Sequence, residues 1–260
     1  MTGEISRAIS STAYQTYEKR LLKEVMSSPV PHHVAVIMDG NRRYAHDVGI
    51  LISEGHEKGK DKLEEMLEWC MDIGIKVLTV FAFSTENVSR EEGEIETLMR
   101  MFVQNFKMLG DDDRVHKNRI RVRVIGSRDL LPANLKESIV YAEEKTKDYD
   151  NYFFNIAVGY GGREEIVDAI KSMARDVKDG KIAVDSIDSE LFSSYLYTAE
   201  LPDPDLILRT SGEERISNFL LWQLAYSELY FSDVYWPGFR KIDFLRAVRS
   251  YQMRVRRFGK

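Results

Sequence analysis

The stretch that decides the fold is His33-Val-Ala-Val-Ile-Met-Asp-Gly-Asn-Arg-Arg-Tyr44. Its first half, Val34 to Met38, is an apolar and partly β-branched run, which is typical of a buried strand. Asp39-Gly40-Asn41 then ends the strand, because all three residue types favour turns or helix caps. We therefore expect a strand that delivers a carboxylate, a glycine and an amide to the start of a helix.

Two arginines, Arg42 and Arg43, follow this turn directly. Backbone N–H groups at a helix start point outward, and a guanidinium group binds an anion with two parallel hydrogen bonds. The carboxylate of Asp39 could hold Mg²⁺ against the same anion. An ordinary strand-to-helix turn with a solvated arginine pair explains these residues equally well, so the rest of the chain has to decide.

Apolar strands alternate with helical patterns along the whole chain. The expected strands are 34–38, 77–82, 120–125, 152–158, 206–208 and 229–234. The expected helices are 1–28, 55–73, 91–109, 132–147, 163–177, 187–195 and 242–257. This alternation predicts one α/β domain with a mostly parallel central sheet and helices on both faces. Residues 111–117 read as a solvated connection, and 120–125, where arginines alternate with apolar residues, read as an edge strand.

The amino-acid composition limits which classes of protein this chain can belong to. The 260 residues are 43% hydrophobic and 30% charged, as in soluble globular proteins. A net charge of -5 argues against a nucleic-acid-binding protein, which would usually be basic. The single Cys70 excludes an internal disulfide. We find no apolar run that could span a bilayer and no signal peptide, so we expect a cytoplasmic protein, with peripheral contact to a membrane possible for product release.

Residues 1–28 are expected to form an N-terminal helical arm, and residues 29–260 the main domain. Tyr14, Tyr17, Leu21, Leu22 and Val25 form one helical stripe, and Pro29 ends the helix. We expect this arm to pack against the domain. A membrane-surface helix is the alternative, because basic residues at 19, 20 and 23 accompany the stripe.

Polar residues collect where the expected strands end. In open parallel sheets, ligands bind beyond the carboxyl ends of the strands. The residues at these ends are Asp39 and Asn41, Ser84, Glu86 and Asn87, Tyr160 with its glycines, and Arg209 and Thr210. Loops are polar in general, but arginines beside a carboxylate that suits a metal ion indicate a diphosphate site.

Five blocks of the chain, in order, resemble the signatures of the cis-prenyltransferases, the family of undecaprenyl and dehydrodolichyl diphosphate synthases. The blocks are Met38 to Tyr44, Gly55-His56 with Gly59, Phe81 to Asn87, Asn155 to Arg163, and Leu208 to Gln223 running on to Glu228. The resemblance covers roughly residues 30–258, and its last block is long and distinctive. It implies the fold of that family, with an apolar tunnel beside the sheet.

The resemblance implies a Mg²⁺-dependent enzyme that condenses isopentenyl diphosphate with an allylic prenyl diphosphate to a short- or medium-chain Z-polyprenyl diphosphate. Asp39 would be catalytic, and Asn41 and Ser84 would assist proton loss. The implied metal residues are Asp39 and Glu228, and Glu94 matches a glutamate on a mobile segment. The implied substrate-binding residues are Gly40, Asn41, Arg42, Arg43, Tyr44, His56, Phe83, Asn87, Arg90, Arg209, Arg215 and Ser217.

The length of the product is expected to depend on the floor of the tunnel, which the resemblance places at Tyr152. Phe154 shares a face of the strand with Tyr152, and Met101 and Phe102 on the facing helix could narrow the tunnel further. Burying one five-carbon unit gains roughly 3–4 kcal/mol at about 0.8 per CH₂, and overpacking against a large tyrosine costs a comparable amount, about 1–3 kcal/mol. We therefore expect growth to stop at a short or medium chain.

Two positions depart from the family pattern. Ile52 stands where the family usually has an arginine that meets the allylic diphosphate, and Val88 stands where a tryptophan is common. These departures leave open a second function, transfer of a prenyl group to an alcohol or to another prenyl diphosphate. A third possibility is a non-catalytic partner subunit, but the retained Asp39 and Arg209 argue against it.

The C-terminus carries a further motif, Arg257-Phe258-Gly259. It resembles the family's Arg-x-Gly motif, which reaches across the dimer to the neighbouring site. One chain therefore holds both the Asp39 block and this motif. We expect an active homodimer.

Overall fold

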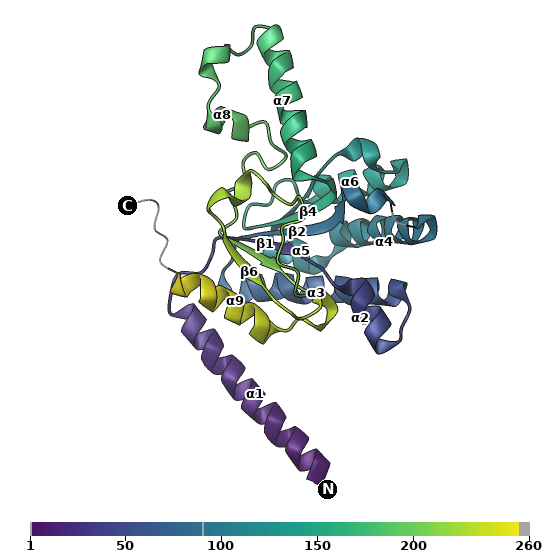
Figure 1. Ribbon diagram of the computed structural model, residues 1–260, viewed down its shortest axis with the longest axis vertical. Coiled ribbons are helices and arrows are strands. Elements are labelled where there is room, and N and C mark those ends of the chain that lie inside the picture. The colour runs from purple at the N-terminus through teal and green to yellow at the C-terminus, as the bar shows by residue number, and fades with distance from the viewer. Residues whose placement is uncertain (1, 90, 255–260) are drawn as a thin grey trace.

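The computed structural model describes residues 2–89 and 91–254, without the side chains of 2–13, 89 and 92. Its centre is a six-stranded sheet with the order β3-β4-β2-β1-β5-β6, in which every pairing is parallel (Figure 1). The strands are β1 (His33–Ile37), β2 (Val77–Ser84), β3 (Ile120–Ile125), β4 (Tyr152–Tyr160), β5 (Leu206–Arg209) and β6 (Glu228–Phe231). The predicted parallel α/β domain is thereby confirmed.

Helices connect the strands. They are α1 (Thr2–Met26), α2 (Asn41–Val48), α3 (Ile52–Ile73), α4 (Glu92–Asp111), α5 (Asp113–Asn118), α6 (Ala133–Thr146), α7 (Gly162–Lys178), α8 (Ser189–Ser193) and α9 (Lys241–Met253). Short 3₁₀ turns lie at η1 (Thr85–Ser89), η2 (Arg128–Leu130), η3 (Val184–Ser186), η4 (Gln223–Tyr226) and η5 (Trp236–Gly238). Figure 1 shows α3 and α9 on one side of the sheet, while α7 and α8 project from the other.

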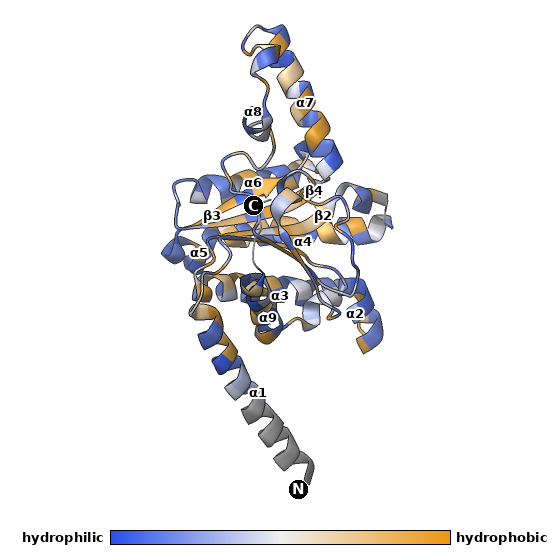
Figure 2. Ribbon diagram, turned by 60° about the vertical axis from the view of Figure 1, so that its left-hand side comes forward, coloured by the Kyte–Doolittle hydropathy of each residue, from blue (hydrophilic) through white to orange (hydrophobic). Residues whose placement is uncertain are grey.

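Both faces of the sheet are buried. Val34 and Val36 of β1 join the larger apolar cluster, together with side chains of α3, α4, α6 and α9. Ala35 and Ile37 point to the opposite face and join a smaller cluster with Phe219. Figure 2 shows the hydrophobic residues concentrated on the strands and the outer helix surfaces mostly hydrophilic. Burial on both faces explains why the strands are nearly continuous apolar runs.

Several boundaries differ from the expectation, and the largest difference lies at 111–117. The charged residues there form the helix α5, because the Asp112 side chain accepts a hydrogen bond from the Arg114 backbone N–H at 2.7 Å and caps it. Helix α3 begins at Ile52 rather than at residue 55, because the Glu54 carboxylate accepts the Leu51 N–H at 2.8 Å. The expectation that residues 255–257 continue the last helix lies outside the described residues.

The N-terminal helix α1 packs along α9. Leu21 and Val25 are fully buried, and Glu24 pairs with Arg249 at 2.6 Å. The Arg240 guanidinium lies 5.3 Å from the centre of the Tyr14 ring. The packing expected for this arm is thus present in its second half, while the domain division at residue 28 stays a prediction. No helix within residues 2–89 and 91–254 is long and apolar enough to cross a membrane.

A row of buried, hydrogen-bonded polar side chains connects three strands of the sheet. The Asn155 amide donates to Thr79 Oγ1 at 3.0 Å, and Thr79 Oγ1 lies 2.7 Å from His33 Nε2. His33 Nδ1 lies 2.7 Å from the Pro202 carbonyl oxygen, which can only accept. His33 is therefore neutral with its proton on Nδ1, and burial lowers the pKa of His33 to about 4.

This buried histidine predicts an acid-sensitive stability. In the unfolded chain the pKa of His33 returns to about 6.5, so between about pH 6.5 and pH 4 the unfolded state binds more protons. The free energy of unfolding should fall by up to about 3 kcal/mol as the pH is lowered through this window. Urea unfolding of the wild type and of His33→Gln measures it. The difference in the free energy of unfolding between the two proteins should shrink as the pH falls. A difference that stays constant with pH would contradict a neutral buried His33.

Candidate active site

The site lies at the carboxyl ends of the neighbouring strands β1 and β5. Ile37, the last residue of β1, is the register partner of Arg209, the last residue of β5. The chain after β1 turns sharply at Gly40, whose φ of +104° favours glycine, and α2 begins at the next residue. A Cβ atom on Gly40 would also lie 2.8 Å from the Tyr235 ring. This turn places Asp39 directly beside Arg209.

The carboxylate of Asp39 lies between two guanidinium groups. Asp39 Oδ2 accepts a hydrogen bond from Arg209 Nη2 at 2.8 Å, and Oδ1 accepts one from Arg43 Nη2 at 3.2 Å. Thr210 Oγ1 fixes the backbone, since it donates to the Asp39 carbonyl at 2.7 Å and accepts the Asp39 N–H at 3.0 Å. Partial burial alone would raise the pKa of Asp39, but the arginines outweigh it and lower that pKa below its usual value. Asp39 is therefore ionised near neutral pH.

Arg209 joins Asp39 to a tightly turned loop. Its side chain is only 4% exposed, and Nη1 donates to the Arg215 carbonyl and to Ser217 Oγ, the latter at 2.8 Å. The buried Nε has no hydrogen-bond partner within the described part of the chain. A buried guanidinium that keeps a free donor is suited to receive an anion.

Asn218 anchors this loop. Ser217, Asn218 and Leu220 all have positive φ, which costs energy in residues other than glycine. Asn218 Nδ2 donates to Glu86 at 3.1 Å and to Glu164 at 3.0 Å. These bonds tie the loop to η1 and to the start of α7 and hold it in the strained conformation.

Arg43 is fixed by three groups besides Asp39. Its Nη2 donates to Ser211 Oγ at 2.6 Å and its Nη1 to Glu213 at 3.0 Å. The Tyr235 ring centre lies 5.6 Å from the guanidinium carbon. Both arginines are thus preorganised around one carboxylate, from two different segments of the chain.

Helix α3 packs closely on the first turn of α2. A Cβ atom on Gly59 would come within 2.3 Å of Asn41 Oδ1, so the glycine permits the contact. Asn41 Oδ1 is buried and accepts no hydrogen bond from the described residues. One turn earlier on α3, His56 Nε2 lies 3.4 Å from Glu94, which also lies 3.8 Å from Arg42. Helices α2, α3 and α4 therefore meet at this edge.

Ser84 and Asn87 hold the end of β2. The Ser84 N–H donates to Asn87 Oδ1 and the Asn87 N–H donates to Ser84 Oγ, both at 3.2 Å. The Ser84 hydroxyl also donates to the Glu86 carboxylate, and this bond helps to lower the pKa of Glu86 below its usual value.

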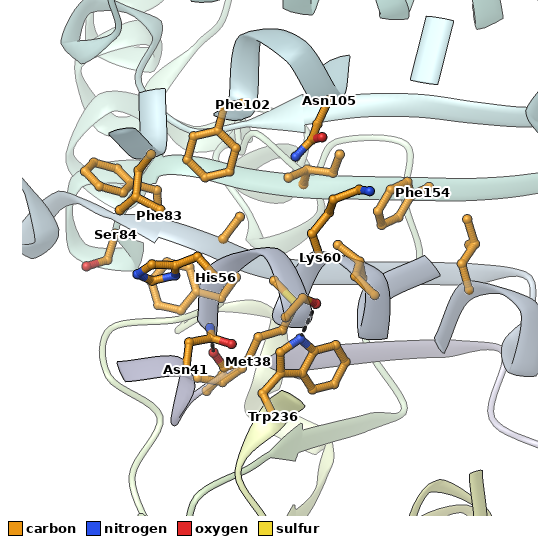
Figure 3. Close-up of a pocket in the computed structure, with 18 of the residues that line it drawn as sticks. Met38, Asn41, His56, Lys60, Phe83, Ser84, Phe102, Asn105, Phe154 and Trp236 are labelled. Atoms are coloured by element: carbon orange, nitrogen blue, oxygen red, sulfur yellow. Dashed lines mark hydrogen bonds between the residues drawn. The ribbon is translucent and has the colours of Figure 1, made fainter. Parts of the chain in front are cut away.

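A cavity of about 930 Å³ extends from these polar groups between α3, α4 and the sheet. Figure 3 shows Asn41, His56 and Ser84 at one end of the pocket and Phe154 at the other, with Phe102, Asn105 and Lys60 between them. Most of its wall beyond the polar end is apolar. The apolar lining includes Leu63, Leu67 and Met71 of α3, Leu98, Met101, Phe102 and Phe106 of α4, and Phe83, Phe154 and Ile156 of the strands.

Most of the site residues expected from the sequence come together here. Those that line the cavity are Asp39, Asn41, His56, Phe83, Ser84, Asn87, Arg209, Ser217, Met101, Phe102 and Phe154. Gly40 forms the turn, Arg43 contacts Asp39, and Arg42 and Tyr44 lie on α2. Arg215 reaches Arg209 through its carbonyl, while its side chain pairs with Glu213. Arg90 and residues 257–259 lie outside the described residues.

Two expectations are corrected by the geometry. Glu228 is the register partner of Leu206 at the amino end of β5, so it lies at the opposite edge of the sheet from Asp39 and pairs with Arg254 at 2.5 Å. Within one chain, these two residues cannot share a metal ion. Tyr152, the first residue of β4, does not line the cavity, and its ring lies 4.2 Å from Lys76 Nζ instead.

Other residues of the site were not anticipated. Trp236 closes the wall near Asn41 and donates from Nε1 to the Gly59 carbonyl at 2.7 Å. Ser211 and Glu213 position Arg43, and Lys60 and Asn105 add polar groups to the apolar part of the cavity. Trp236, in the 3₁₀ turn after β6, had no periodic pattern to mark it. Lys60 had one signal, because it follows Gly59 on the helix expected to line the tunnel.

The Asp39 carboxylate and its neighbouring arginines have the chemistry of a magnesium–phosphate site. Asp39 supplies a carboxylate beside two arginines that can hold an anion, and Mg²⁺ commonly binds through one or two carboxylates, water and substrate phosphates. No group of three His, Cys, Asp or Glu side chains in the described residues is placed to hold a metal. Asp39 is a residue that could hold Mg²⁺ together with water and phosphate oxygens.

Comparisons with known proteins agree with this geometry. A prenyltransferase family model, described as undecaprenyl diphosphate synthase, matches residues 37–259. A tritrans,polycis-undecaprenyl-diphosphate synthase (geranylgeranyl-diphosphate specific) from Thermoplasma acidophilum is 57% identical over 98% of this chain and 99% of its own. The equivalent protein of Thermoplasma volcanium is 59% identical over the same shares.

A solved structure is also similar. Lavandulyl diphosphate synthase from Lavandula x intermedia, in complex with dimethylallyl diphosphate, superposes with a TM-score of 0.85 at 37% identity. The match covers 89% of this chain and 99% of that one.

Proposed function

The chain belongs to the undecaprenyl diphosphate synthase family and is a prenyltransferase that makes polyprenyl diphosphates, and on this premise we propose its substrates, product and mechanism. It extends an allylic diphosphate with isopentenyl diphosphate in cis. The starter is geranylgeranyl diphosphate and the product has undecaprenyl length, as the names of its similar archaeal relatives suggest. The observation that carries the proposal is Asp39, held by two arginines at the polar end of an apolar cavity.

The arginines bind the diphosphates. The charges of both guanidinium groups are balanced by Asp39 and Glu213, and the loop carbonyl of Arg215 accepts a hydrogen bond from Arg209. A diphosphate competes for them because a guanidinium fork matches phosphate oxygens. When Arg43 and Arg209 turn to the diphosphate, the carboxylate of Asp39 is released. Asp39 would hold Mg²⁺, and the ion would supply stabilisation of the negative charge on the leaving diphosphate.

The chain's own residues position the two reactants and guide the proton that is lost. The allylic C–O bond breaks as diphosphate leaves, the double bond of isopentenyl diphosphate attacks the allylic carbon, and one proton is lost from the isopentenyl unit. A role for Asn41 in this proton loss is supported by its Oδ1 atom, which is buried at the cavity and has no hydrogen-bond partner among the described residues. Asn41 and Ser84 guide that proton toward the departing diphosphate. His56 and Arg42 complete the edge around the diphosphates.

The apolar part of the cavity holds the growing chain. Each five-carbon unit buried there gains roughly 4 kcal/mol, at about 0.8 kcal/mol per CH₂ group. Leu63, Leu67 and Met71 lie at intervals of four on α3 and form one apolar stripe along the chain's path. The cavity is thus a prenyl tunnel, with α3 and α4 as its walls and β2 and β4 as its floor.

A second candidate rests on Ile52. This residue begins α3, is 42% exposed and offers no positive charge to an allylic diphosphate. An enzyme with weak allylic binding could transfer the prenyl group to another prenyl diphosphate or to an alcohol. Incubation with the allylic substrate alone separates the two functions, because cis elongation requires isopentenyl diphosphate and the alternative does not.

The enzyme acts as a homodimer. Supporting this, Val167 and Ile170 lie three residues apart on α7 and are about half exposed, 47% and 53%, so one side of this projecting helix is apolar. A second copy of the chain covers it. Light scattering should give twice the chain mass of 30.1 kDa. Val167→Glu/Ile170→Glu should lower the mass to one chain, and a monomeric wild type would contradict the dimer.

Removing the charge of Asp39 tests the catalytic assignment. Asp39→Asn keeps the shape of the side chain but loses the charge that balances two arginines and would hold Mg²⁺. We expect kcat to fall roughly 100- to 1,000-fold, the size of the loss when one preorganised transition-state contact is removed. The assay uses labelled isopentenyl diphosphate with geranylgeranyl diphosphate.

Asp47→Asn is the matched control, since Asp47 is an exposed carboxylate on α2 that lies 3.4 Å from His46 Nδ1. It should retain wild-type turnover. Near-normal turnover of Asp39→Asn would refute the role of Asp39. A panel of shorter starters in the same assay tests the preference for geranylgeranyl diphosphate, which should give the highest kcat/KM.

Product length should respond to Phe154 more than to Tyr152. Phe154 is 3% exposed and lines the cavity, so Phe154→Ala removes part of its floor and should lengthen the products. Tyr152→Ala changes a side chain that faces Lys76 outside the cavity and should leave the product distribution closer to that of the wild type. Chromatography of the products measures both. Longer products from Tyr152→Ala alone would place the floor at residue 152.

A further inference from the structure

Arg43 and Arg209 both contact Asp39, but the structure holds them in different ways. The side chain of Arg209 is only 4% exposed, whereas that of Arg43 is 41% exposed. An arginine side chain in contact with water has many rotamers of similar energy, and ordering it costs entropy. Burial fixes Arg209, so Arg43 needs contacts that fix it at the surface.

Two of the polar contacts of Arg43 are with carboxylates. Its Nη2 lies 3.2 Å from Asp39 Oδ1, and its Nη1 lies 3.0 Å from Glu213 Oε1. In the proposed mechanism a diphosphate takes the place of Asp39, and the N–H groups of Arg43 turn to phosphate oxygens. The contact with Asp39 therefore cannot keep Arg43 in place during this exchange.

The ring of Tyr235 is a partner of another kind. Its centre lies 5.6 Å from the guanidinium carbon of Arg43, within the distance of a cation–π contact. A guanidinium group over an aromatic face uses none of its N–H groups for that contact, so all of them remain available to oxygen atoms. The ring contact can thus persist while the hydrogen-bond partners of Arg43 change.

The backbone on both sides of Tyr235 fixes the ring beside the site. The Trp236 N–H donates to the Asp39 carbonyl at 3.0 Å, and the Ser211 N–H donates to the Val234 carbonyl at 2.9 Å. Tyr235 is therefore joined through its two neighbours to the turn that carries Asp39 and to the segment that carries Ser211. Both of these residues also contact Arg43, so the ring and the polar partners of Arg43 belong to one hydrogen-bonded unit.

We propose that Tyr235 is a positioning residue of the diphosphate site, which holds the guanidinium group of Arg43 while its hydrogen bonds pass from Asp39 to a diphosphate. This rests on the proposed function. With the ring present, Arg43 stays ordered throughout the exchange. Without the ring, the diphosphate has to order an exposed arginine as it binds, so its affinity falls.

Tyr235→Leu tests this contact, because leucine removes the aromatic face but keeps an apolar side chain against Gly40. An exposed cation–π contact corresponds to roughly two- to fivefold in affinity. We expect the Kd of inorganic pyrophosphate, measured by calorimetric titration in EDTA, to rise by this factor. Tyr235→Phe keeps the aromatic face without the hydroxyl and should restore the affinity of the wild type.

A double-mutant cycle shows whether the ring acts through Arg43. Adding Tyr235→Leu to Arg43→Ala should cause no further loss of pyrophosphate binding, because the partner of the ring is already absent. In the enzyme assay, Tyr235→Leu should raise the KM for geranylgeranyl diphosphate and leave kcat within about twofold, since the ring acts on binding. A ring that only stabilised the fold would act equally in both backgrounds.

Tyr17→Leu is the matched control, because the Arg246 guanidinium lies at the same distance, 5.6 Å, from the centre of the Tyr17 ring on α1. Its pyrophosphate affinity and its KM should equal those of the wild type. If Tyr235→Leu fails to fold, Tyr235→Met supplies the test, since methionine also fills irregular space without an aromatic face.

Wild-type pyrophosphate affinity in Tyr235→Leu would overturn the proposal. An equal loss from Tyr235→Leu with and without Arg43 would overturn it too, as would a loss in Tyr235→Phe as large as that in Tyr235→Leu. A wild type that makes no cis-prenyl product would instead refute the proposed function. The pyrophosphate titration needs no turnover, so the two failures are distinguishable.

Discussion

The contact on which the site depends is the carboxylate of Asp39 between Arg43 and Arg209. The three residues come from the turn after β1, the first turn of α2 and the end of β5. Only the parallel pairing of β1 with β5 brings them together, because it puts Ile37 beside Arg209. The strained loop that holds Ser217 and the helix packing allowed by Gly59 both serve to keep this arrangement. A diphosphate enters a site where two guanidinium groups already lie at one edge, and these groups exchange contacts with Asp39 for contacts with phosphate oxygens.

The cavity combines two environments that prenyl transfer requires. Its polar end is preorganised for anions, whereas the wall between α3 and α4 is apolar and gains free energy with each buried unit. The apolar wall continues to Phe154 and Ile156 on β4. Growth in such a cavity is favoured for as long as the added unit is buried against this wall.

The sequence predicted the strands well because burial on both faces leaves a nearly continuous apolar run, as in Val34 to Met38. It predicted the residues at the strand ends because a parallel sheet gathers them at one edge. It missed α5, whose charged residues look like a loop until Asp112 is seen to cap the Arg114 N–H. Glu228 and Tyr152 were misplaced for a related reason. A motif identifies a residue but not which end of its strand it occupies, and the register alone puts Glu228 at the amino edge.

The central claim is that the arginines around Asp39 bind diphosphate and that Asp39 then recruits Mg²⁺. Calorimetric titration of the wild type and of Asp39→Asn with inorganic pyrophosphate, in EDTA and in Mg²⁺, tests it most directly. The account predicts that Mg²⁺ tightens binding to the wild type by tenfold or more, about 1.4 kcal/mol. Asp39→Asn should still bind pyrophosphate in EDTA but gain nothing from Mg²⁺. An equal gain from Mg²⁺ in both proteins would contradict the account.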